Sequence, residues 1–257
     1  MITLRDFTIG FGRRELLSHV DASFSDGCLT ALLGRNGTGK STMLRAIARL
    51  NTAYTGTVTI DGADTATLSG IEMARRLAFV TTERTRIPGL TCADVVGMGR
   101  APYTGWSGHL HPTDHAIVAE ALRSTGMQDY AERYMQSMSD GECQRVMIAR
   151  ALAQDTANLL LDEPTSFLDM PNRYQLATLL RRLAHDRGKC IIFSTHELDI
   201  ALHICDTIAL VDNGRLHHLP TRDMADSGLL QRLFAIEGLD FDPLRGFLKT
   251  EVRSDFG

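Results

Sequence analysis

One stretch of the 257-residue sequence, Gly34-Arg35-Asn36-Gly37-Thr38-Gly39-Lys40-Ser41, matches the pattern G-x-x-x-x-G-K-[ST] at every fixed position. Its three glycines allow the backbone to curl so that the N–H groups face an anion. A helix that begins directly after such a loop adds partial positive charge. In this pattern the lysine reaches the β- and γ-phosphates of a nucleoside triphosphate, and the hydroxyl of Ser41 ligates Mg²⁺. The stretch therefore predicts a phosphate-binding loop.

A second candidate lies at Leu159-Leu160-Leu161-Asp162-Glu163, an apolar run that ends in two acids. Desolvated carboxylates need a partner cation. This pattern predicts that Asp162 lies near Mg²⁺ and that Glu163 is the base that polarises an attacking water. The alternative interpretation is a strand that simply ends at the solvent, but the phosphate loop favours the chemical one.

The loop and the acidic pair alone fit a kinase, a GTPase or a helicase-like ATPase, and a third segment separates these classes. Met138-Ser139-Asp140-Gly141-Glu142 resembles the signature of ABC ATPases, usually written LSGGQ. Ser139-x-x-Glu142 is also a capping box, so a well-capped helix is the plainer interpretation. The two are compatible, because a capped helix N-terminus is a good partner for phosphate.

Two more segments resemble loops of the ABC family. Residues 164–169, which end in Asp169, look like its D-loop, and Ser194-Thr195-His196-Glu197 looks like the segment with its switch histidine. His196 lies about thirty residues beyond Glu163, as the family layout implies. Phe11 falls where the family places an aromatic side chain that stacks on adenine, and a buried strand aromatic is the alternative.

The resemblance covers essentially the whole chain and implies ATP and Mg²⁺ as ligands. It places Ser41 and Asp162 at the metal, Glu163 and His196 in catalysis, and Ser139, Gly141 and Glu142 against the ATP of a partner chain. The implied ATP contacts are Phe11, Gly34, Arg35, Asn36, Gly37, Thr38, Gly39, Lys40, Ser41 and Thr42. Residues 68–78 and 90–102 most resemble the ATPases of iron-chelate (siderophore), haem and cobalamin importers.

The same resemblance implies partners. Two copies of the chain would sandwich two ATP molecules, and a transmembrane permease would be driven by the opening and closing of that dimer. A separate substrate-binding protein would deliver the transported ligand. We therefore expect a cytoplasmic protein attached to the inner face of the cell membrane through the permease.

One segment departs from the family pattern. ABC ATPases normally have a glutamine after the strand that corresponds to Leu77–Val80, where it contacts Mg²⁺. This chain reads Thr81-Thr82-Glu83-Arg84. Either Thr82 or Glu83 could take the glutamine's place.

The elements that must position these residues follow from hydrophobic patterning. Short apolar runs at 29–33, 159–161 and 190–193 predict buried parallel strands, each followed by a helical pattern, and residues 1–60 predict further strands. Residues 90–153 instead show helix punctuation, including the capping box that begins at Thr91 and Pro112 before an apolar helical stripe. We predict an α/β fold: a P-loop NTPase (RecA-like) core at about 1–85 and 154–257 with a helical subdomain at about 86–153, of the ABC ATPase type.

Composition narrows the function classes. A net charge of −4 argues against a nucleic-acid binder that depends on charge. No apolar run approaches the roughly 18 residues of a membrane-spanning helix, and the N-terminus lacks the layout of a secretory signal. The five cysteines show no metal-ligand spacing, so reduced and mostly buried thiols are expected.

Two other functions stay open. A soluble ABC ATPase without a transporter could serve in cluster assembly, repair or translation, although the duplicated cassettes and long coiled coils of such proteins are missing from the sequence. A P-loop small-molecule kinase would need a substrate lid and leaves residues 138–142 and His196 unexplained.

Overall fold

A six-stranded sheet holds the strands that were predicted from apolar runs. The computed structural model describes residues 1–12, 14–82, 87–105, 108–166, 168–234, 239–242 and 247–250. Within these, the sheet has the order β10 (Arg215–Pro220), β9 (Thr207–Asp212), β3 (Leu29–Gly34), β8 (Cys190–Ser194), β7 (Asn158–Leu161) and β6 (Leu77–Val80). All neighbours pair in parallel except β10 and β9. Every residue of β7 and β8 is buried, which explains their unbroken apolar sequences.

The N-terminal residues form a four-stranded antiparallel sheet. Its order is β2 (Arg14–Phe24), β1 (Ile2–Phe11), β4 (Tyr54–Ile60) and β5 (Ala63–Asp64). The Asp61-Gly62 turn between β4 and β5 has positive φ at both residues, 51° and 78°. This is the backbone that a tight hairpin requires.

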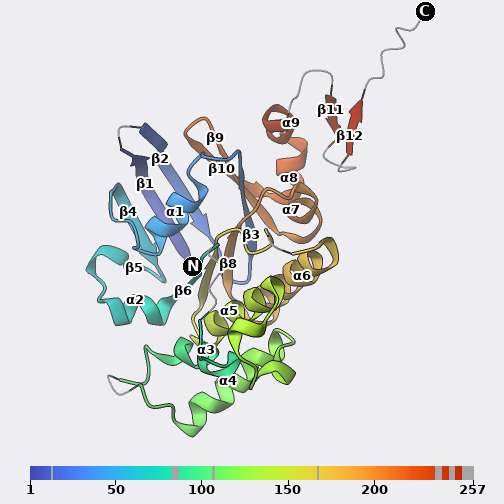
Figure 1. Cartoon of the computed structure of the whole chain (residues 1–257). Helices are drawn as coiled ribbons and strands as arrows, with labels where there is room; N and C mark the ends of the chain where they lie inside the picture. The colour runs from blue at the N-terminus through green and yellow to red at the C-terminus, as the bar shows by residue number, and fades with distance from the viewer. Residues whose placement is uncertain are drawn as a thin grey trace, which may run out of the picture.

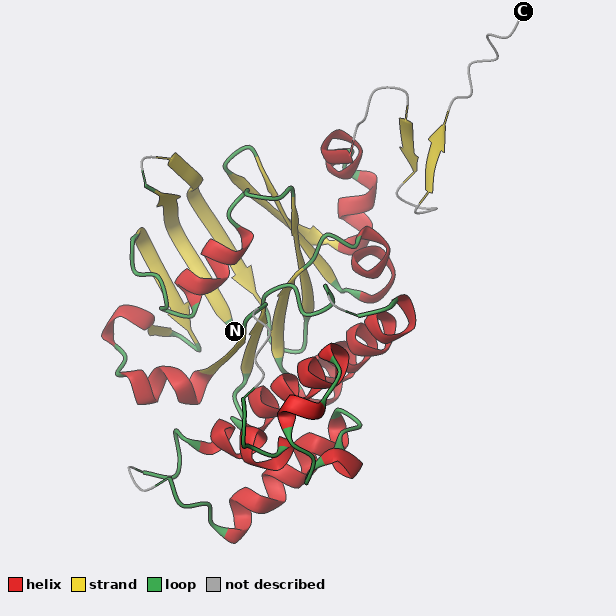
Figure 2. Cartoon of the chain, in the orientation of Figure 1, coloured by secondary structure: helices red, strands yellow, loops and turns green. Residues whose placement is uncertain are grey.

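Helices cover both faces of the six-stranded sheet, and Figures 1 and 2 show their arrangement. The helices are α1 (Lys40–Ile47), α2 (Gly70–Arg76), α3 (Cys92–Gly97), α4 (Pro112–Ser124), α5 (Asp140–Ala153), α6 (Met170–Arg187), α7 (Leu198–Ile204), α8 (Thr221–Asp226) and α9 (Leu229–Phe234). Short 3-10 turns occupy Thr65–Thr67, Met98–Arg100, Gln128–Tyr130 and Met135–Ser137. A hairpin of β11 (Leu239–Asp242) and β12 (Phe247–Thr250) follows α9.

The described chain between β6 and β7 is helical, with α3, α4 and α5 packed together at the bottom of Figure 1. Both capping boxes predicted here are confirmed: Thr91 with Asp94 at α3, and Ser139 with Glu142 at α5. Pro112 opens α4. The division into a core and a helical subdomain stays a prediction, since one hydrophobic cluster runs from the sheet into these helices.

Two hydrophobic clusters stabilise the fold, one on each face of the six-stranded sheet. Leu29, Ala31 and Leu33 of β3 contribute to the cluster under α3–α9, whereas Leu32 points into the other cluster, with α1 and the antiparallel sheet. The five cysteines are free, and all but the partly exposed Cys28 are buried, as predicted. Among the helices of the described residues, none is long and apolar enough to cross a lipid bilayer.

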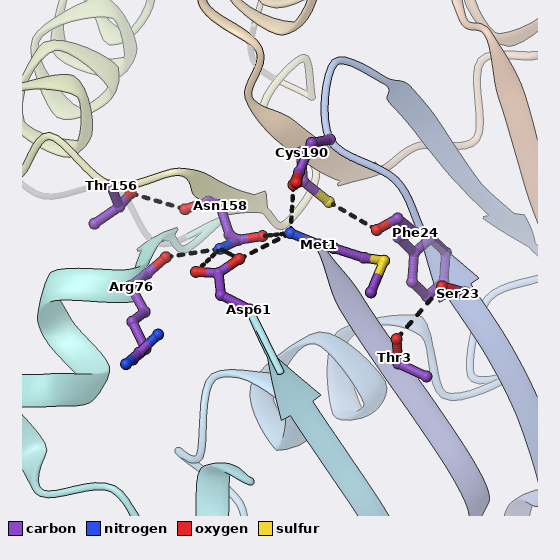
Figure 3. Close-up of polar contacts among 10 residues, drawn as sticks. Met1, Thr3, Ser23, Phe24, Asp61, Arg76, Thr156, Asn158 and Cys190 are labelled. Carbon is purple, nitrogen blue, oxygen red and sulfur yellow. Dashed lines mark hydrogen bonds and ion pairs between the residues drawn. The ribbon is translucent and has the colours of Figure 1, made fainter. Parts of the chain in front are cut away.

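A polar cluster fixes the start of β7 (Figure 3). The fully buried Asn158 donates to both carboxylate oxygens of Asp61, at 3.2 and 3.1 Å, and to Arg76 O at 3.0 Å. The amino group of Met1 also contacts this cluster, 2.8 Å from Asp61 Oδ1 and 3.1 Å from Asn158 Oδ1, and pairs with Asp26. These bonds join β7, the β4–β5 turn and the end of α2, and β7 leads directly into Asp162.

Candidate functional site

The phosphate loop joins the end of β3 to the start of α1. Gly39 is the N-cap of α1 with φ 104° and ψ 10°, and no side chain caps the helix. A Cβ on Gly34 would lie 2.8 Å from Thr38 Oγ1, and one on Gly39 would lie 2.9 Å from Leu16 Cβ. Glycine is therefore required at both positions, for space and for the backbone conformation. The first N–H groups of α1 are left available to an anion.

Lys40 lies inside the curve of this loop. Its side chain is buried, and Nζ donates to Gly34 O at 2.8 Å and to Arg35 O at 3.2 Å. Burial lowers the pKa of Lys40, and the nearby carboxylates of Glu163 and Asp162 oppose that shift. The lysine is thus held at the centre of the loop by two neutral carbonyl acceptors. A charged phosphate oxygen can replace them and forms a stronger hydrogen bond.

A cavity of about 520 Å³ opens beside the loop. It brings together seven of the residues that the sequence predicted, six from the loop and α1 plus Glu163. The lining residues are Arg14, Leu16, Asn36, Gly37, Gly39, Lys40, Ser41, Thr42 and Glu163. Arg14 and Leu16 of β2 were not predicted, because nothing in their own sequence marks them as neighbours of the loop.

The side chains of Arg35 and Thr38 do not face the cavity beside Lys40. The Arg35 guanidinium donates to Leu233 O in α9 through Nε and Nη2, at 3.2 and 2.8 Å. Both residues line a neighbouring cavity of about 660 Å³. Of the loop residues, these two have side chains that hold the loop in place and do not line the cavity beside Lys40.

Asp162 is the centre of a hydroxyl network at the ends of three strands. The residue is 2% exposed, and its Oδ1 accepts hydrogen bonds from Ser41 Oγ at 2.9 Å and from Ser194 Oγ at 2.7 Å. Thr82 Oγ1 donates to Asp162 O at 3.0 Å. The buried acid is therefore satisfied by hydroxyl groups in the described part of the chain, without an ion pair. Ser194 was missed in the sequence, where a serine at the end of a buried strand is not distinctive.

Glu163 is half-buried and has an uncommon backbone conformation, with φ 46°. Its N–H donates to Ser194 Oγ at 2.8 Å, and its carbonyl accepts from Ser166 Oγ at 2.7 Å. A non-glycine residue with positive φ is unusual and needs such support. The conformation turns the side chain of Glu163 to the cavity that Lys40 and Ser41 line.

The oxygen atoms of Asp162 and Ser41 fit a magnesium ion. Asp162 Oδ1 and Ser41 Oγ are oxygen atoms 2.9 Å apart, at the edge of the phosphate loop. Mg²⁺ usually takes only one or two protein carboxylates and completes its shell with substrate phosphates and water. The described residues contain no group of three or more His, Cys, Asp or Glu side chains that could hold a metal.

Three of the predicted residues are placed less completely. Phe11 ends β1, but its side chain lies outside the described residues, as does the whole of Glu83. His196 is exposed and follows the carboxyl end of β8, and it does not line the cavity beside Lys40. The roles predicted for these residues stay predictions.

The signature-like segment lies away from this cavity, at the N-terminus of α5. Glu142 Oε2 accepts from Ser139 N at 2.8 Å and from Ser139 Oγ at 2.7 Å, and these bonds hold the pKa of Glu142 below its usual range. Asp169 likewise caps α6, accepting from Asn172 N at 3.1 Å. Ser139 and Asp169 are exposed. Their side chains are thus available to a second molecule.

Comparison with known proteins agrees with this geometry. The family described as ABC transporter matches residues 17–166. The chain is 37% identical over 253 residues to an uncharacterised ABC transporter ATP-binding protein of Methanocaldococcus jannaschii, covering 98% of this chain and 87% of the relative. It is 39% identical over 212 residues to the achromobactin transport ATP-binding protein of Dickeya dadantii, covering 82% and 79%.

A third relative is the iron(3+)-hydroxamate import ATP-binding protein of Bacillus subtilis, 34% identical over 230 residues, with 89% of this chain and 86% of the relative covered. Among solved structures, a dimeric ATP-binding cassette in a post-hydrolysis state with ADP and Pi matches with a TM-score of 0.74 at 28% identity. The match covers 86% of this chain and 99% of that one.

Proposed function

Because this chain belongs to the ABC transporter family, we propose that it is the ATP-binding and ATP-hydrolysing subunit of a membrane importer for an iron chelate or a related metal chelate. One observation carries the catalytic part of the proposal. Lys40, Ser41 and Glu163 line a single cavity, and Ser41 is bonded to the buried Asp162 behind it.

The residues support hydrolysis in the following way. The uncapped first turn of α1 and the N–H groups of the loop bind the phosphates of ATP, and Lys40 neutralises charge on the β- and γ-phosphates. Glu163 accepts a proton from the attacking water. Ser41 and Asp162 hold Mg²⁺, which when bound neutralises charge on the phosphate oxygens. His196 completes the site beside the γ-phosphate when the dimer closes.

A second copy of the chain supplies the missing side of the site. Ser139, Gly141 and Glu142 lie at an exposed helix N-terminus that does not line the chain's own cavity. The solved cassette with ADP and Pi is dimeric, which supports a dimer of this chain. In that dimer, this segment faces the ATP of the partner. Closure with ATP and reopening after hydrolysis then drive the permease.

The names of the relatives support the transported class. Two relatives that cover most of this chain are named for achromobactin transport and iron(3+)-hydroxamate import. In the import complex, a permease anchors the chain at the inner face of the membrane, and a substrate-binding protein delivers the chelate. A soluble ABC ATPase without a permease is less well supported, since no relative cited above has such a name.

The catalytic proposal is tested with MgATP binding to the purified chain by calorimetry. Lys40→Ala removes the cation at the phosphates, so binding should become undetectable. Arg187→Ala, which changes an exposed cation on α6, should bind as the wild type does. Wild-type affinity in Lys40→Ala would remove the phosphate loop from the mechanism.

Transport is tested by uptake of radioactive iron chelates in cells that lack the gene. Wild-type protein should restore uptake, and Glu163→Gln should not. Copurification of a polytopic membrane protein is expected with both forms. Normal uptake in the deletion strain, together with copurification of only soluble proteins, would favour the ATPase that works without a permease.

A further inference from the structure

Glu197, the residue after His196, is a buried carboxylate with an incomplete set of partners. It is 8% exposed, and its Oε1 lies 2.9 Å from Arg173 Nη1 in an ion pair. In the described part of the chain, neither carboxylate oxygen has a hydrogen bond of normal geometry. Burial raises the pKa of Glu197, and the charge of Arg173 opposes the shift. Of the groups that favour its charged form, Arg173 acts most strongly, ahead of His196 and Thr165, so the buried charge depends on that arginine.

The same guanidinium makes a second contact. Arg173 Nε donates to Leu168 O at 2.6 Å, in the loop that follows Glu163. One side chain of α6 therefore joins the segment that carries His196 to the loop of residues 164–169. Its planar donor fork allows both contacts at once, which a lysine cannot reproduce.

Leu168 extends this connection to the start of α5. Its side chain is buried, and a Cβ on Gly141 would lie 3.1 Å from Leu168 Cδ2. Leu168 thus packs directly against the segment Ser139–Glu142. A continuous set of contacts runs from Glu197 through Arg173 and Leu168 to Gly141.

We propose that Arg173 and Glu197 form a positioning bridge that makes the placement of the His196 segment depend on residues 164–169 and on the N-terminus of α5. The effect of this bridge on catalysis rests on the proposed function. His196 serves the chain's own ATP, whereas Asp169 and residues 139–142 face the ATP of the second copy. The bridge links the two ATP sites of the dimer, since coupling between sites needs an element whose equilibrium both sites bias.

Hydrogen exchange on the nucleotide-free full chain tests the bridge without reference to catalysis. Arg173→Gln should speed amide exchange at least about tenfold in segments 139–143, 164–169 and 194–198, because a charge-assisted contact to each loop is lost. Glu197→Gln should do the same in 194–198. Arg187→Gln is the matched control, since Arg187 lies on the same helix in an exposed ion pair with Glu120. Exchange that changes only within α6, or not at all, would overturn the bridge.

Kinetics test the consequence. Arg173→Gln should lower kcat for ATP hydrolysis about tenfold or more, leave the KM for ATP nearly unchanged and reduce the Hill coefficient toward one. Arg173→Lys keeps the charge and should recover part of kcat. Equal kcat and Hill coefficient in Arg173→Gln and wild type would overturn the coupling. Absence of hydrolysis in the wild type itself would count against the proposed function, whereas the exchange experiment still decides the bridge.

Discussion

Ser194, the last residue of β8, donates a hydrogen bond at 2.7 Å to Oδ1 of Asp162, which directly follows the neighbouring strand β7. The same hydroxyl accepts a hydrogen bond from Glu163 N at 2.8 Å. One side chain at the end of β8 therefore fixes both acids that follow β7. It orients the carboxylate that we propose binds Mg²⁺ and supports the unusual backbone of the proposed base.

Ser194→Ala should destabilise the chain and slow hydrolysis. Removal of the hydroxyl takes one donor from a buried carboxylate and one acceptor from a partly buried N–H, and the loss of such a partner typically costs about 1–3 kcal/mol. We expect a loss of that size in urea unfolding and a clear fall in ATP turnover. Ser137→Ala, at an exposed serine in a 3-10 turn, should change neither quantity. Unchanged turnover in Ser194→Ala would mean that Glu163 is positioned without it.

Glu163→Gln should separate binding from hydrolysis. The amide keeps the size of the side chain but cannot accept the proton, so turnover should fall at least about 10²-fold. Binding of MgATP should persist, because Lys40, Ser41 and Asp162 are unchanged. A variant that binds ATP without hydrolysing it should accumulate as a dimer when ATP is present. Light scattering measures this dimer. A monomer at high concentration would contradict the sandwich arrangement for the isolated subunit.

Local patterns in the sequence were sufficient for much of this site. The loop from Gly34 to Ser41 and the acids after β7 are contiguous motifs, and the capping boxes at Thr91 and Ser139 depend on residues three positions apart. Each was confirmed in its structural position, since the physical cause lies within one turn or one strand end. Their chemical roles stay predictions.

Contacts between distant segments could not be predicted in this way. Ser194 meets Asp162 only because β8 lies between β3 and β7, and hydrophobic patterns do not determine strand order. The motif did not predict that the Arg35 guanidinium donates to Leu233 O, far along the chain. Its predicted ATP contact stays a prediction. The ion pair of Arg173 with Glu197 likewise depends on the packing of α6 against α7.

Asp114 gives a prediction for acid pH. Its carboxylate accepts from His111 N at 3.0 Å and pairs with the buried Arg100 at 2.8 Å. The main-chain bond from His111, and then Arg100, lower the pKa of Asp114 in the folded chain. A depressed folded pKa contributes stability above the unfolded value, about pH 4, and that stability is lost as the pH falls through the folded pKa.

Asp114→Asn should therefore lower Tm near neutral pH and lose less additional stability than the wild type between about pH 5 and pH 2. Thermal unfolding across that range measures the difference. Asp129→Asn, at an exposed acid in a 3-10 turn, is the control, and its Tm should change with pH in parallel with that of the wild type. Parallel curves for Asp114→Asn as well would show that its ion pair adds no pH-dependent stability.

The segment after β6 lacks the glutamine that ABC ATPases place near Mg²⁺, and Thr82 and Glu83 are the candidates to replace it. Thr82 is half-buried, and its Oγ1 donates to Asp162 O at 3.0 Å, which leaves the oxygen's lone pairs able to accept. Glu83 lies outside the described residues. A carboxylate is the stronger Mg²⁺ ligand, but it would add negative charge beside Asp162, Glu163 and the γ-phosphate. That repulsion is large in a partly desolvated site.

We therefore expect Thr82 to face the metal, through a water molecule, and Glu83 to face Arg84, Arg86 or the permease. Thr82→Ala should lower ATPase activity of the isolated chain, since both the bond to Asp162 and the acceptor near the metal are lost. Glu83→Ala should leave that activity near the wild-type level and weaken iron-chelate uptake in cells. Paired ATPase and uptake assays on the two variants distinguish the candidates. If Glu83→Ala abolishes basal hydrolysis while Thr82→Ala is harmless, the carboxylate has taken the glutamine's place.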